Sequence, residues 1–207
     1  MTEDNENDII ILKGGLLLEN KQDKELLITL PLPKSVNHIY GRNKFGSTYL
    51  KKEGKEYKIK AIKEIKKQVK EQGWNKLKEN EFCYFDTVVY MNKKGRDSDN
   101  IYKLLQDSCT LSEVIWFDDT YVWSRTQRSY IDSNNPRVEI TITPTNTIGI
   151  FKDKQEYETF KQNNCNKCNK KIDGERSCTI HKKLLDNRIV EEVDYENLKC
   201  NKLKEKK

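Results

Sequence analysis

The stretch of residues 95–119 constrains the fold most strongly, because it places acidic residues where regular structure is expected to begin and end. Asp97 and Asp99 are two residues apart and come just before an apolar pattern of helical spacing that starts at Ile101. In an extended segment, residues two apart point to the same side of the chain, so both carboxylates can face one ligand. The pattern therefore predicts a helix that starts beside this pair, with Asp99 or Asn100 as its N-cap.

The predicted helix and the segment after it add a lysine and further carboxylates. Lys103 follows Asp99 by four residues and Asp107 follows Lys103 by four, so the three side chains form one ridge of a helix. The apolar run Val114–Phe117 then predicts a short buried strand that leads to Asp119. Carboxylates that converge from a helix start and a strand end offer the oxygen ligands that magnesium prefers. Each motif taken singly is also typical of an exposed cap or turn, and this structural interpretation stays open.

Two phrases of the sequence, taken together, resemble a known family signature. The first, at residues 30–40, reads Leu-Pro-Leu-Pro-Lys-Ser-Val-Asn-His-Ile-Tyr. The second, at residues 96–119, contains Arg-Asp-Ser-Asp-Asn, then Lys103 and Asp107, and ends with Trp-Phe-Asp-Asp. This combination resembles the RusA Holliday-junction resolvases over roughly residues 26–144. One departure is visible, since the connection around Thr110–Val114 is a residue longer than the family pattern and lacks its usual glycine.

The resemblance implies a magnesium-dependent, structure-specific endodeoxyribonuclease that resolves Holliday junctions and other branched DNA in recombination and repair. Asp97, Asp99 and Asp119 would hold the metal, which polarises the scissile phosphate and activates water. Lys103 would stabilise the charge that develops on the phosphate. Because a four-way junction is two-fold symmetric and needs two coordinated nicks, the resemblance also implies a homodimer.

Two further acidic residues take supporting roles, and two other functions stay open. Asp107 would orient Lys103 or act as a further ligand, and Asp118 is the weaker candidate of the Asp118-Asp119 pair by analogy with the family pattern. A non-catalytic DNA-binding protein is the alternative of a different class. The acidic cluster argues against it, because carboxylates beside DNA repel phosphate unless a cation neutralises them. A nuclease of flaps or other structured DNA would share the same chemistry.

A basic segment predicts where DNA would bind. Residues 41–78 contain thirteen Lys and Arg against four Glu, a local balance of +9 in a chain whose formal net charge is +6. Apolar residues at four-residue steps predict that Lys52–Glu71 is a helix, so many of these charges lie along one rod. Such a surface can neutralise several phosphates, although a lysine-rich solvated face is the ordinary alternative. The DNA-binding candidates are Arg42, Lys44, Lys51, Lys52, Lys55, Lys93, Lys94 and Arg96.

Period-two and β-rich stretches predict the remaining sheet strands. Together with Val114–Phe117 and the two helices described above, these stretches predict an α+β fold with a single mixed β-sheet and two helices packed on it, as the resemblance also suggests. The apolar content of 35% equals the charged content, so the core is expected to be modest. The predicted strands are Leu26–Leu32, Phe82–Met91, Tyr121–Tyr130 and Arg137–Thr143.

The C-terminal part carries a cysteine pattern that predicts a small metal-binding appendage. Cys165 and Cys168 form one Cys-x-x-Cys pair, and after nine residues Cys178 and His181 follow with the same spacing. These four ligands suit a closed, structural zinc site, without which so small a loop could hardly fold. Cys200 is a less favoured substitute for His181, and unpaired reduced thiols are the alternative to a metal site.

These observations divide the chain into three segments. Residues 1–25 form an N-terminal extension with a possible hairpin around Gly14-Gly15, residues 26–145 the nuclease domain, and residues 146–207 the zinc-binding extension. Within the extension, a short helix over Phe151–Phe160 and a terminal helix over Leu184–Leu203 are expected. No stretch approaches the ~20 apolar residues of a membrane span, and the acidic N-terminus is unlike a signal peptide. We therefore expect a soluble, cytoplasmic protein with no membrane partner.

Overall fold

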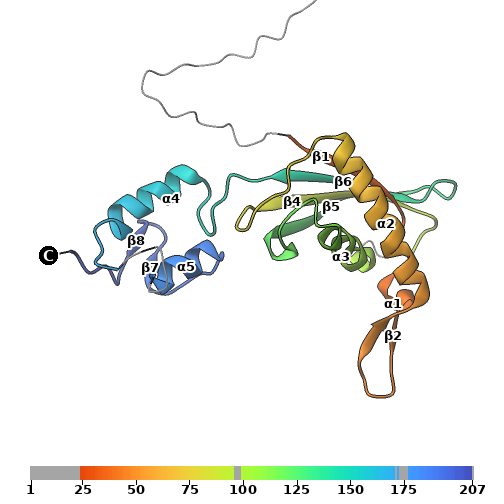
Figure 1. The fold of residues 1–207 in the computed structure, drawn as a ribbon, viewed down its shortest axis with the longest axis horizontal. Coiled ribbons are helices and arrows are strands. Elements are labelled where there is room, and N and C mark those ends of the chain that lie inside the picture. The colour runs from red at the N-terminus through yellow and green to blue at the C-terminus, as the bar shows by residue number, and fades with distance from the viewer. Residues whose placement is uncertain (1–23, 96–98, 171, 173–176, 207) are drawn as a thin grey trace, which may run out of the picture.

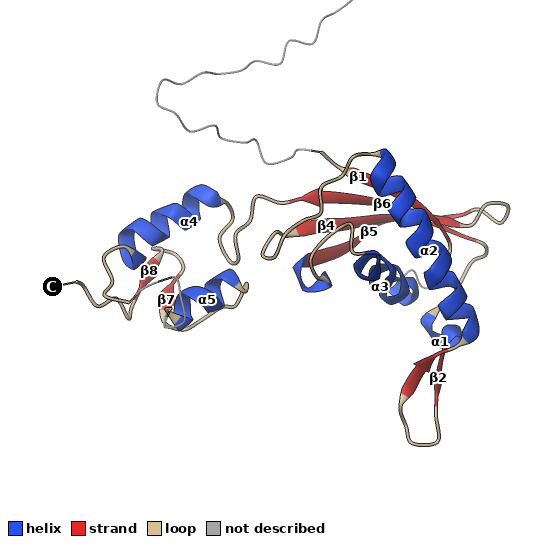
Figure 2. Cartoon of the chain, viewed as in Figure 1, coloured by secondary structure: helices blue, strands red, loops and turns tan. Residues whose placement is uncertain are grey.

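A four-stranded mixed sheet with the strand order β1-β6-β4-β5 organises the larger part of the chain (Figures 1 and 2). The computed structural model describes residues 24–95, 99–170, 172 and 177–206, apart from the side chains of Val36, Asn37 and Asp99. β4 runs parallel to β5, and the other neighbouring strands are antiparallel. The predicted α+β class with one mixed sheet is confirmed. The sheet strands are β1 (Leu26–Pro31), β4 (Cys83–Met91), β5 (Val122–Ile131) and β6 (Arg137–Pro144).

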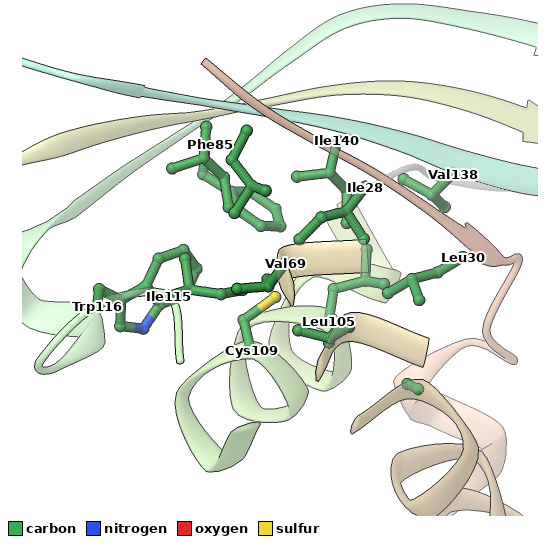
Figure 3. Close-up of a cluster of buried hydrophobic side chains, with 14 of the residues drawn as sticks. Ile28, Leu30, Val69, Phe85, Leu105, Cys109, Ile115, Trp116, Val138 and Ile140 are labelled. Carbon is green, nitrogen blue, oxygen red and sulfur yellow. The ribbon is translucent and has the colours of Figure 1, made fainter. Parts of the chain in front are cut away.

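Helices α2 (Lys52–Glu71) and α3 (Tyr102–Ser112) pack on one face of this sheet (Figure 1). Strict alternation along β1 and β4 directs every second side chain to that face, where Phe85 is fully buried. Figure 3 shows how Val69 of α2 and Leu105 of α3 point toward the strand side chains, Ile140 among them. The core is therefore the layer between sheet and helices, as the two apolar periodicities predicted.

The outer edge of β1 is occupied by side chains of α2. The amide of Gln72 accepts a hydrogen bond from the Leu27 N–H at 3.0 Å and donates one to the Leu27 carbonyl at 2.6 Å. Gln68 makes the same pair of bonds with Thr29, both at 2.9 Å. Each glutamine amide thus takes the place of a neighbouring peptide group, so the exposed ladder of this edge strand is satisfied. The sheet's other edge is β5, whose residues are mostly exposed.

The predicted strand at Val114–Phe117 is wrong, because this segment is an irregular connection after α3. The chain leaves α3 at Glu113 in the left-handed region (φ 61°), a conformation that glycine adopts more easily. The Ile115 carbonyl then accepts hydrogen bonds from the backbone N–H of Leu77 at 2.9 Å and from the indole N–H of Trp74 at 3.0 Å. Ile115 and Trp116 are buried as expected, but Phe117 is 54% exposed, and the Ile115 carbonyl pairs with a loop rather than with a strand.

A two-stranded hairpin that the sequence pattern did not predict follows α1 (Val36–Ile39). It projects from the body beside the first turn of α2 (Figure 1). The backbone N–H of Lys51 donates to the Ile39 carbonyl at 2.7 Å, and a side chain in place of the Gly54 hydrogen would collide with Leu50. These contacts fix the hairpin base to the body. The elements here are α1 (Val36–Ile39), β2 (Tyr40–Arg42) and β3 (Thr48–Leu50).

The C-terminal part has its own apolar cluster and mixes short helices with short strands. The expected short helix is present, but the terminal helix predicted over Leu184–Leu203 is wrong, since most of that range forms turns and a two-stranded pair. Gly149, at the start of this part, is required by close approach, because a Cβ there would lie 2.1 Å from the Leu184 carbonyl oxygen. The elements are α4 (Lys154–Phe160), the π-helical segment η3 (Lys161–Cys165), α5 (Thr179–Leu185), β7 (Val193–Asp194) and β8 (Lys199–Cys200).

The hairpin expected in residues 1–25 lies outside the described residues, and the boundaries proposed at 25/26 and 145/146 stay predictions. The buried apolar residues nevertheless fall into two clusters. The larger belongs to the sheet and its helices, and the smaller contains Phe151, Phe160, Leu184, Val190 and Val193. Among the described residues, no helix is long and apolar enough to cross a membrane.

Candidate active site and DNA-binding surface

The acidic pair lies at the junction between β4 and α3, only part of which is described. Asp97 and Arg96 lie outside the described residues, and Asp99 begins the 3-10 turn η1 (Asp99–Ile101) that leads into α3. The N-cap residue of α3 is Ile101, which makes no side-chain capping bond. The prediction that Asp99 or Asn100 caps this helix is therefore wrong, because both residues belong to the 3-10 turn η1 that precedes it.

Asp107 is the centre of the polar contacts beside Lys103. Its carboxylate accepts a hydrogen bond from Lys58 Nζ of α2 at 2.9 Å, whereas Lys103 Nζ stands 3.9 Å away. Burial, followed by the charge of Asp107 and a hydrogen bond to its carboxylate, raises the pKa of Tyr40. Lys103 is the more exposed of the two lysines, since 65% of its side chain is accessible to solvent against 19% for Lys58. Asp107 is thus held mainly by Lys58 and Tyr40, and the ammonium of Lys103 stays open to solvent.

Lys58 and Tyr40 are the site residues that sequence reasoning missed. Lys58 was counted only as one basic residue of a predicted helix, and Tyr40 only as the end of a motif. Their contacts to Asp107 cross 49 residues in the case of Lys58, a separation that helical spacing within one element does not reveal. The position of Tyr40 in the same family phrase as the prolines is the signal that could have identified Tyr40 as a site residue.

The second acidic pair divides into a capping residue and an exposed one. The Asp118 carboxylate accepts the Thr120 N–H at 2.9 Å and caps the 3-10 turn η2 (Asp119–Tyr121). Hydrogen bonding by the Thr120 backbone, then by its hydroxyl, lowers the pKa of Asp118. Asp119 is exposed in the first turn of η2, where its carboxylate is accessible to a ligand. The preference for Asp119 over Asp118 as a ligand stays a prediction, as does its convergence with Asp97 and Asp99, whose side chains lie outside the described residues.

The predicted DNA-binding residues occupy two exposed places. Lys93 and Lys94 lie in the turn after β4, which leads toward the acidic pair. The others that are described lie on the projecting hairpin and the start of α2, where Lys52 is 90% exposed. The hairpin also presents Phe45, which is 81% exposed and was absent from the predicted set. The described residues of the hairpin group are Arg42, Lys44, Lys51, Lys52 and Lys55, all exposed.

The cysteines of the C-terminal part line one small cavity of about 30 Å³. Cys165, Cys168, Cys178 and Cys200 all border it, as does His181. Burial, and then the neighbouring thiols of Cys178, Cys200 and Cys168, raise the pKa of Cys165 to about 11. Burial would also raise the pKa of Cys168, but backbone N–H groups, that of Lys204 first, lower it.

The predicted zinc ligands are not assembled into a metal site. Among the described residues, no three His, Cys, Asp or Glu side chains are grouped so that they could hold a metal ion. The donor set still fits zinc chemically, because thiols from separate segments border one cavity. His181 Nε2 lies 3.1 Å from the Tyr157 hydroxyl, inside the smaller apolar cluster. Cys200, which was the less favoured ligand, borders the same space and is an equal candidate for the fourth position.

A larger cavity lies elsewhere in the described part of the chain. Its volume is about 800 Å³, and it runs between β1, α2 and the turn before β6. Leu104 of α3 reaches its wall, but Lys103, Asp107 and Asp119 do not border it. Of the candidate site residues, Lys103 and Asp119 are exposed on the surface rather than enclosed in this cavity.

Comparison with known proteins gives a family match. The family model described as endodeoxyribonuclease RusA matches residues 31–143, which is more than half of the chain. The matched span runs from the end of β1 to β6, and includes the projecting hairpin, Lys103, Asp107 and Asp119. A search of curated proteins found no match.

Proposed function

Because the chain belongs to the RusA endodeoxyribonuclease family, we propose that it resolves four-way and other branched DNA by magnesium-dependent cleavage of the backbone. The family implies a nuclease of the Holliday-junction resolvase type, and the proposal adds the metal, its ligands and the assembly. The observation that carries it is that one matched span contains the acidic pair, Lys103 and Asp119 together.

Three carboxylates are proposed as magnesium ligands, namely those of Asp97, Asp99 and Asp119. Bound magnesium would polarise the scissile phosphate and lower the pKa of the attacking water. Carboxylates are the hard oxygen donors that this ion prefers, and the exposed position of Asp119 leaves room for substrate and water. Asp118 is not proposed as a ligand, because its carboxylate already caps η2.

Lys103 is proposed to contact the non-bridging oxygens of the scissile phosphate. Its side chain is largely exposed and makes only a 3.9 Å approach to Asp107, so the ammonium can turn toward a bound phosphate. Asp107 would limit the directions that Lys103 can take, because Lys58 holds that carboxylate at 2.9 Å. An ammonium placed where negative charge develops stabilises the transition state more than the ground state.

The basic hairpin and the start of α2 are proposed to bind the arms of the junction. Phosphate neutralisation by exposed lysines gives affinity that is independent of sequence and falls steeply with salt. Two active sites are needed for two symmetric nicks, so we propose that two copies of the chain act together.

The decisive experiment compares a labelled four-way junction with a matched linear duplex, in magnesium and in EDTA. We expect paired, magnesium-dependent nicks near the branch point and none on the duplex. Asp119→Asn should reduce cleavage by about 100-fold or more while junction binding persists. Asp118→Asn is the matched control, because asparagine also caps a helix start, and it should cleave at close to the wild-type rate. Junction binding without cleavage by the wild-type protein would instead favour a non-catalytic DNA-binding protein.

For the C-terminal part we propose structural zinc bound by Cys165, Cys168 and Cys178, with either Cys200 or His181 as the fourth ligand. The support is the cysteine spacing and the shared cavity. Metal content of the purified protein tests the proposal, and the charge-transfer absorption of the cobalt form counts the thiolates. Loss of one thiolate in Cys200→Ala, with an unchanged spectrum in His181→Ala, would assign the fourth ligand to Cys200. If the purified protein contains no stoichiometric metal and cannot take it up, the zinc proposal is wrong and the cysteines are reduced thiols.

A further inference from the structure

The tip of the β2–β3 hairpin presents an aromatic ring to solvent among positive charges. Phe45 is 81% exposed, the highest value among the exposed large apolar side chains of the described residues. Lys44 Nζ lies 5.1 Å from the centre of its ring, and Arg42 is exposed on the same hairpin. Residues 41–52 contain four basic residues and no acidic one. A ring exposed among cations in this way is free to stack on a flat ligand that carries negative charge.

The tip is held in one conformation by its own hydrogen bonds. The side-chain oxygen of Asn43 accepts the Phe45 N–H at 3.0 Å and the Ser47 N–H at 2.9 Å. The Asn43 carbonyl accepts the Gly46 N–H at 3.0 Å, and Gly46 adopts the left-handed φ of 82° that completes the turn. The ring is therefore displayed by a pre-formed turn, and little conformational entropy is lost when it meets a ligand.

The hairpin is also joined to the candidate active site. Its first residue, Tyr40, contacts the Asp107 carboxylate that lies beside Lys103. Phe45 follows Tyr40 by five positions, and at ~3.3 Å per strand residue these five steps span at most about 17 Å. That span equals about five nucleotide steps along DNA, each of ~3.4 Å. A ring seated at a branch point would thus leave the phosphates a few nucleotides away within reach of Lys103.

From this placement we infer that Phe45 stacks on an unpaired or partly unstacked base at the branch point of the DNA, and so selects branched over linear DNA. The inference deepens the proposed function and rests on it for the identity of the substrate. A flat apolar ring beside Lys44, on a hairpin that also carries Arg42, matches a base, which is flat and apolar on its faces and flanked by phosphates. In an intact duplex every base is already stacked on its neighbours, so the ring gains this contact only where stacking is interrupted.

The test compares Phe45→Ala with wild-type protein in binding to a four-way junction and to the matched duplex, at one fixed salt concentration. Phe45→Ala should lose about 10-fold or more in junction affinity and little in duplex affinity, because stacking is absent from the duplex complex. Phe45→Trp should restore the preference. Ile59→Ala is the matched control, since Ile59 is 70% exposed on α2 and lies outside the hairpin. It should bind both DNAs like wild-type protein.

A second readout reports stacking directly. A junction with 2-aminopurine placed at the branch point should change in fluorescence when wild-type protein binds, and much less with saturating Phe45→Ala. Both measurements are made in calcium or EDTA, so they succeed or fail independently of cleavage and of the proposed catalytic residues. Equal loss of affinity for junction and duplex would overturn the inference, as would wild-type behaviour of Phe45→Ala. A change in oligomeric state caused by Phe45→Ala would overturn it too, and would assign the ring to a contact between copies of the chain.

Discussion

The sheet body and the C-terminal part bury apolar side chains by different means. In the body, alternating strands and two amphipathic helices enclose Phe85, Trp116 and eighteen other buried residues. Among the described residues of the C-terminal part, the buried apolar cluster has five members, and the buried polar side chain of Asn164 contacts residues that pack in or against it. Asn164 donates to the carbonyls of Phe160 and Leu198 and accepts the Cys200 N–H, all at 2.8–2.9 Å. Burial of apolar surface stabilises the sheet body, whereas the C-terminal part depends on a few specific polar contacts.

Phenylalanine truncation should separate the two regions most strongly. Phe85→Ala removes a fully buried ring from the body, and we expect the free energy of unfolding to fall by about 3–5 kcal/mol. All three tryptophans lie between residues 74 and 123, so urea denaturation followed by tryptophan fluorescence reports the body alone. Phe160→Ala removes an equally buried ring from the smaller cluster and should leave that transition unchanged. An equal shift of the tryptophan midpoint in both variants would mean that the chain unfolds as one unit.

The difference also explains which parts of the structure the sequence could predict. Both ends of the helix Lys52–Glu71 were predicted correctly, because apolar residues recur at one helical period along these twenty residues. Burial of Val138 and Ile142 on β6 followed from strict alternation in the same way. The run Val114–Phe117 has no such period, so the burial of Ile115 and Trp116 could be predicted, but not the exposure of Phe117 or the backbone partner.

The candidate site was predictable to a similar extent. The acidic motif and Lys103 belong to one local pattern, and that pattern placed Lys103 and Asp107 on one ridge of α3. The contacts of Lys58 and Tyr40 with Asp107 arise only when α2 and the hairpin pack beside α3. In the C-terminal part the predicted terminal helix failed, because buried polar contacts such as those of Asn164 override a weak helical pattern.

Removing the central polar contact should destabilise the C-terminal part alone. Asn164→Ala leaves the Cys200 N–H and the Leu198 carbonyl without this partner, at a cost of about 1–3 kcal/mol. Hydrogen–deuterium exchange should increase in η3 and β8, with unchanged protection in β4 and β6. Asn201→Ala, at an exposed position nearby, is the control and should exchange like wild-type protein. Increased exchange in the body strands would show that the two clusters are energetically coupled.

The glutamine contacts between α2 and β1 lie at the surface of the body and should matter less. The double variant Gln68→Ala and Gln72→Ala removes the four hydrogen bonds to β1, and we expect a loss of about 1–2 kcal/mol. The freed edge should also raise light scattering on heating, since an unpaired strand edge templates aggregation. Lys67→Ala, on the exposed side of the same helix, should change neither quantity. Unchanged scattering in the double variant would show that another element protects this edge.

The smallest expected effect is a pH dependence that differs between the regions. The Arg125 guanidinium, which donates two hydrogen bonds at 2.6 Å, holds the pKa of Asp86 below its ordinary value. The stabilisation is therefore present above a pH of about 3.9, the pKa of an unfolded aspartate, and is lost as pH falls through the lower folded pKa. Asp86→Asn should lower stability at neutral pH by less than about 1 kcal/mol, because Arg125 is half exposed.

Acid titration of two variants checks this assignment. With Asp86→Asn, the difference from wild-type protein in tryptophan-detected stability should vanish at acid pH. Hydrogen bonds from the Asn197 side chain and backbone lower the pKa of Asp194 in the C-terminal part. Asp194→Asn should therefore leave the tryptophan signal unaffected at every pH. A difference that persists undiminished at pH 2 would mean that Asp86 stabilises the sheet by something other than its charge.

The glutamine bonds at β1 also determine how far along the strand the long helix can lie. Four helical residues, from 68 to 72, advance ~6 Å, and two strand residues, from 29 to 27, advance ~6.8 Å. These two spacings nearly coincide, so glutamines one helical repeat apart can each bond a residue of β1 on the same side of the strand. Sliding the helix by less than a full repeat would break all four bonds at once. The far end of α2, which carries Lys58 and adjoins the hairpin, is thereby set at a fixed distance along the sheet. Contacts that span 39 and 45 residues of the sequence thus determine where the helix places its part of the site.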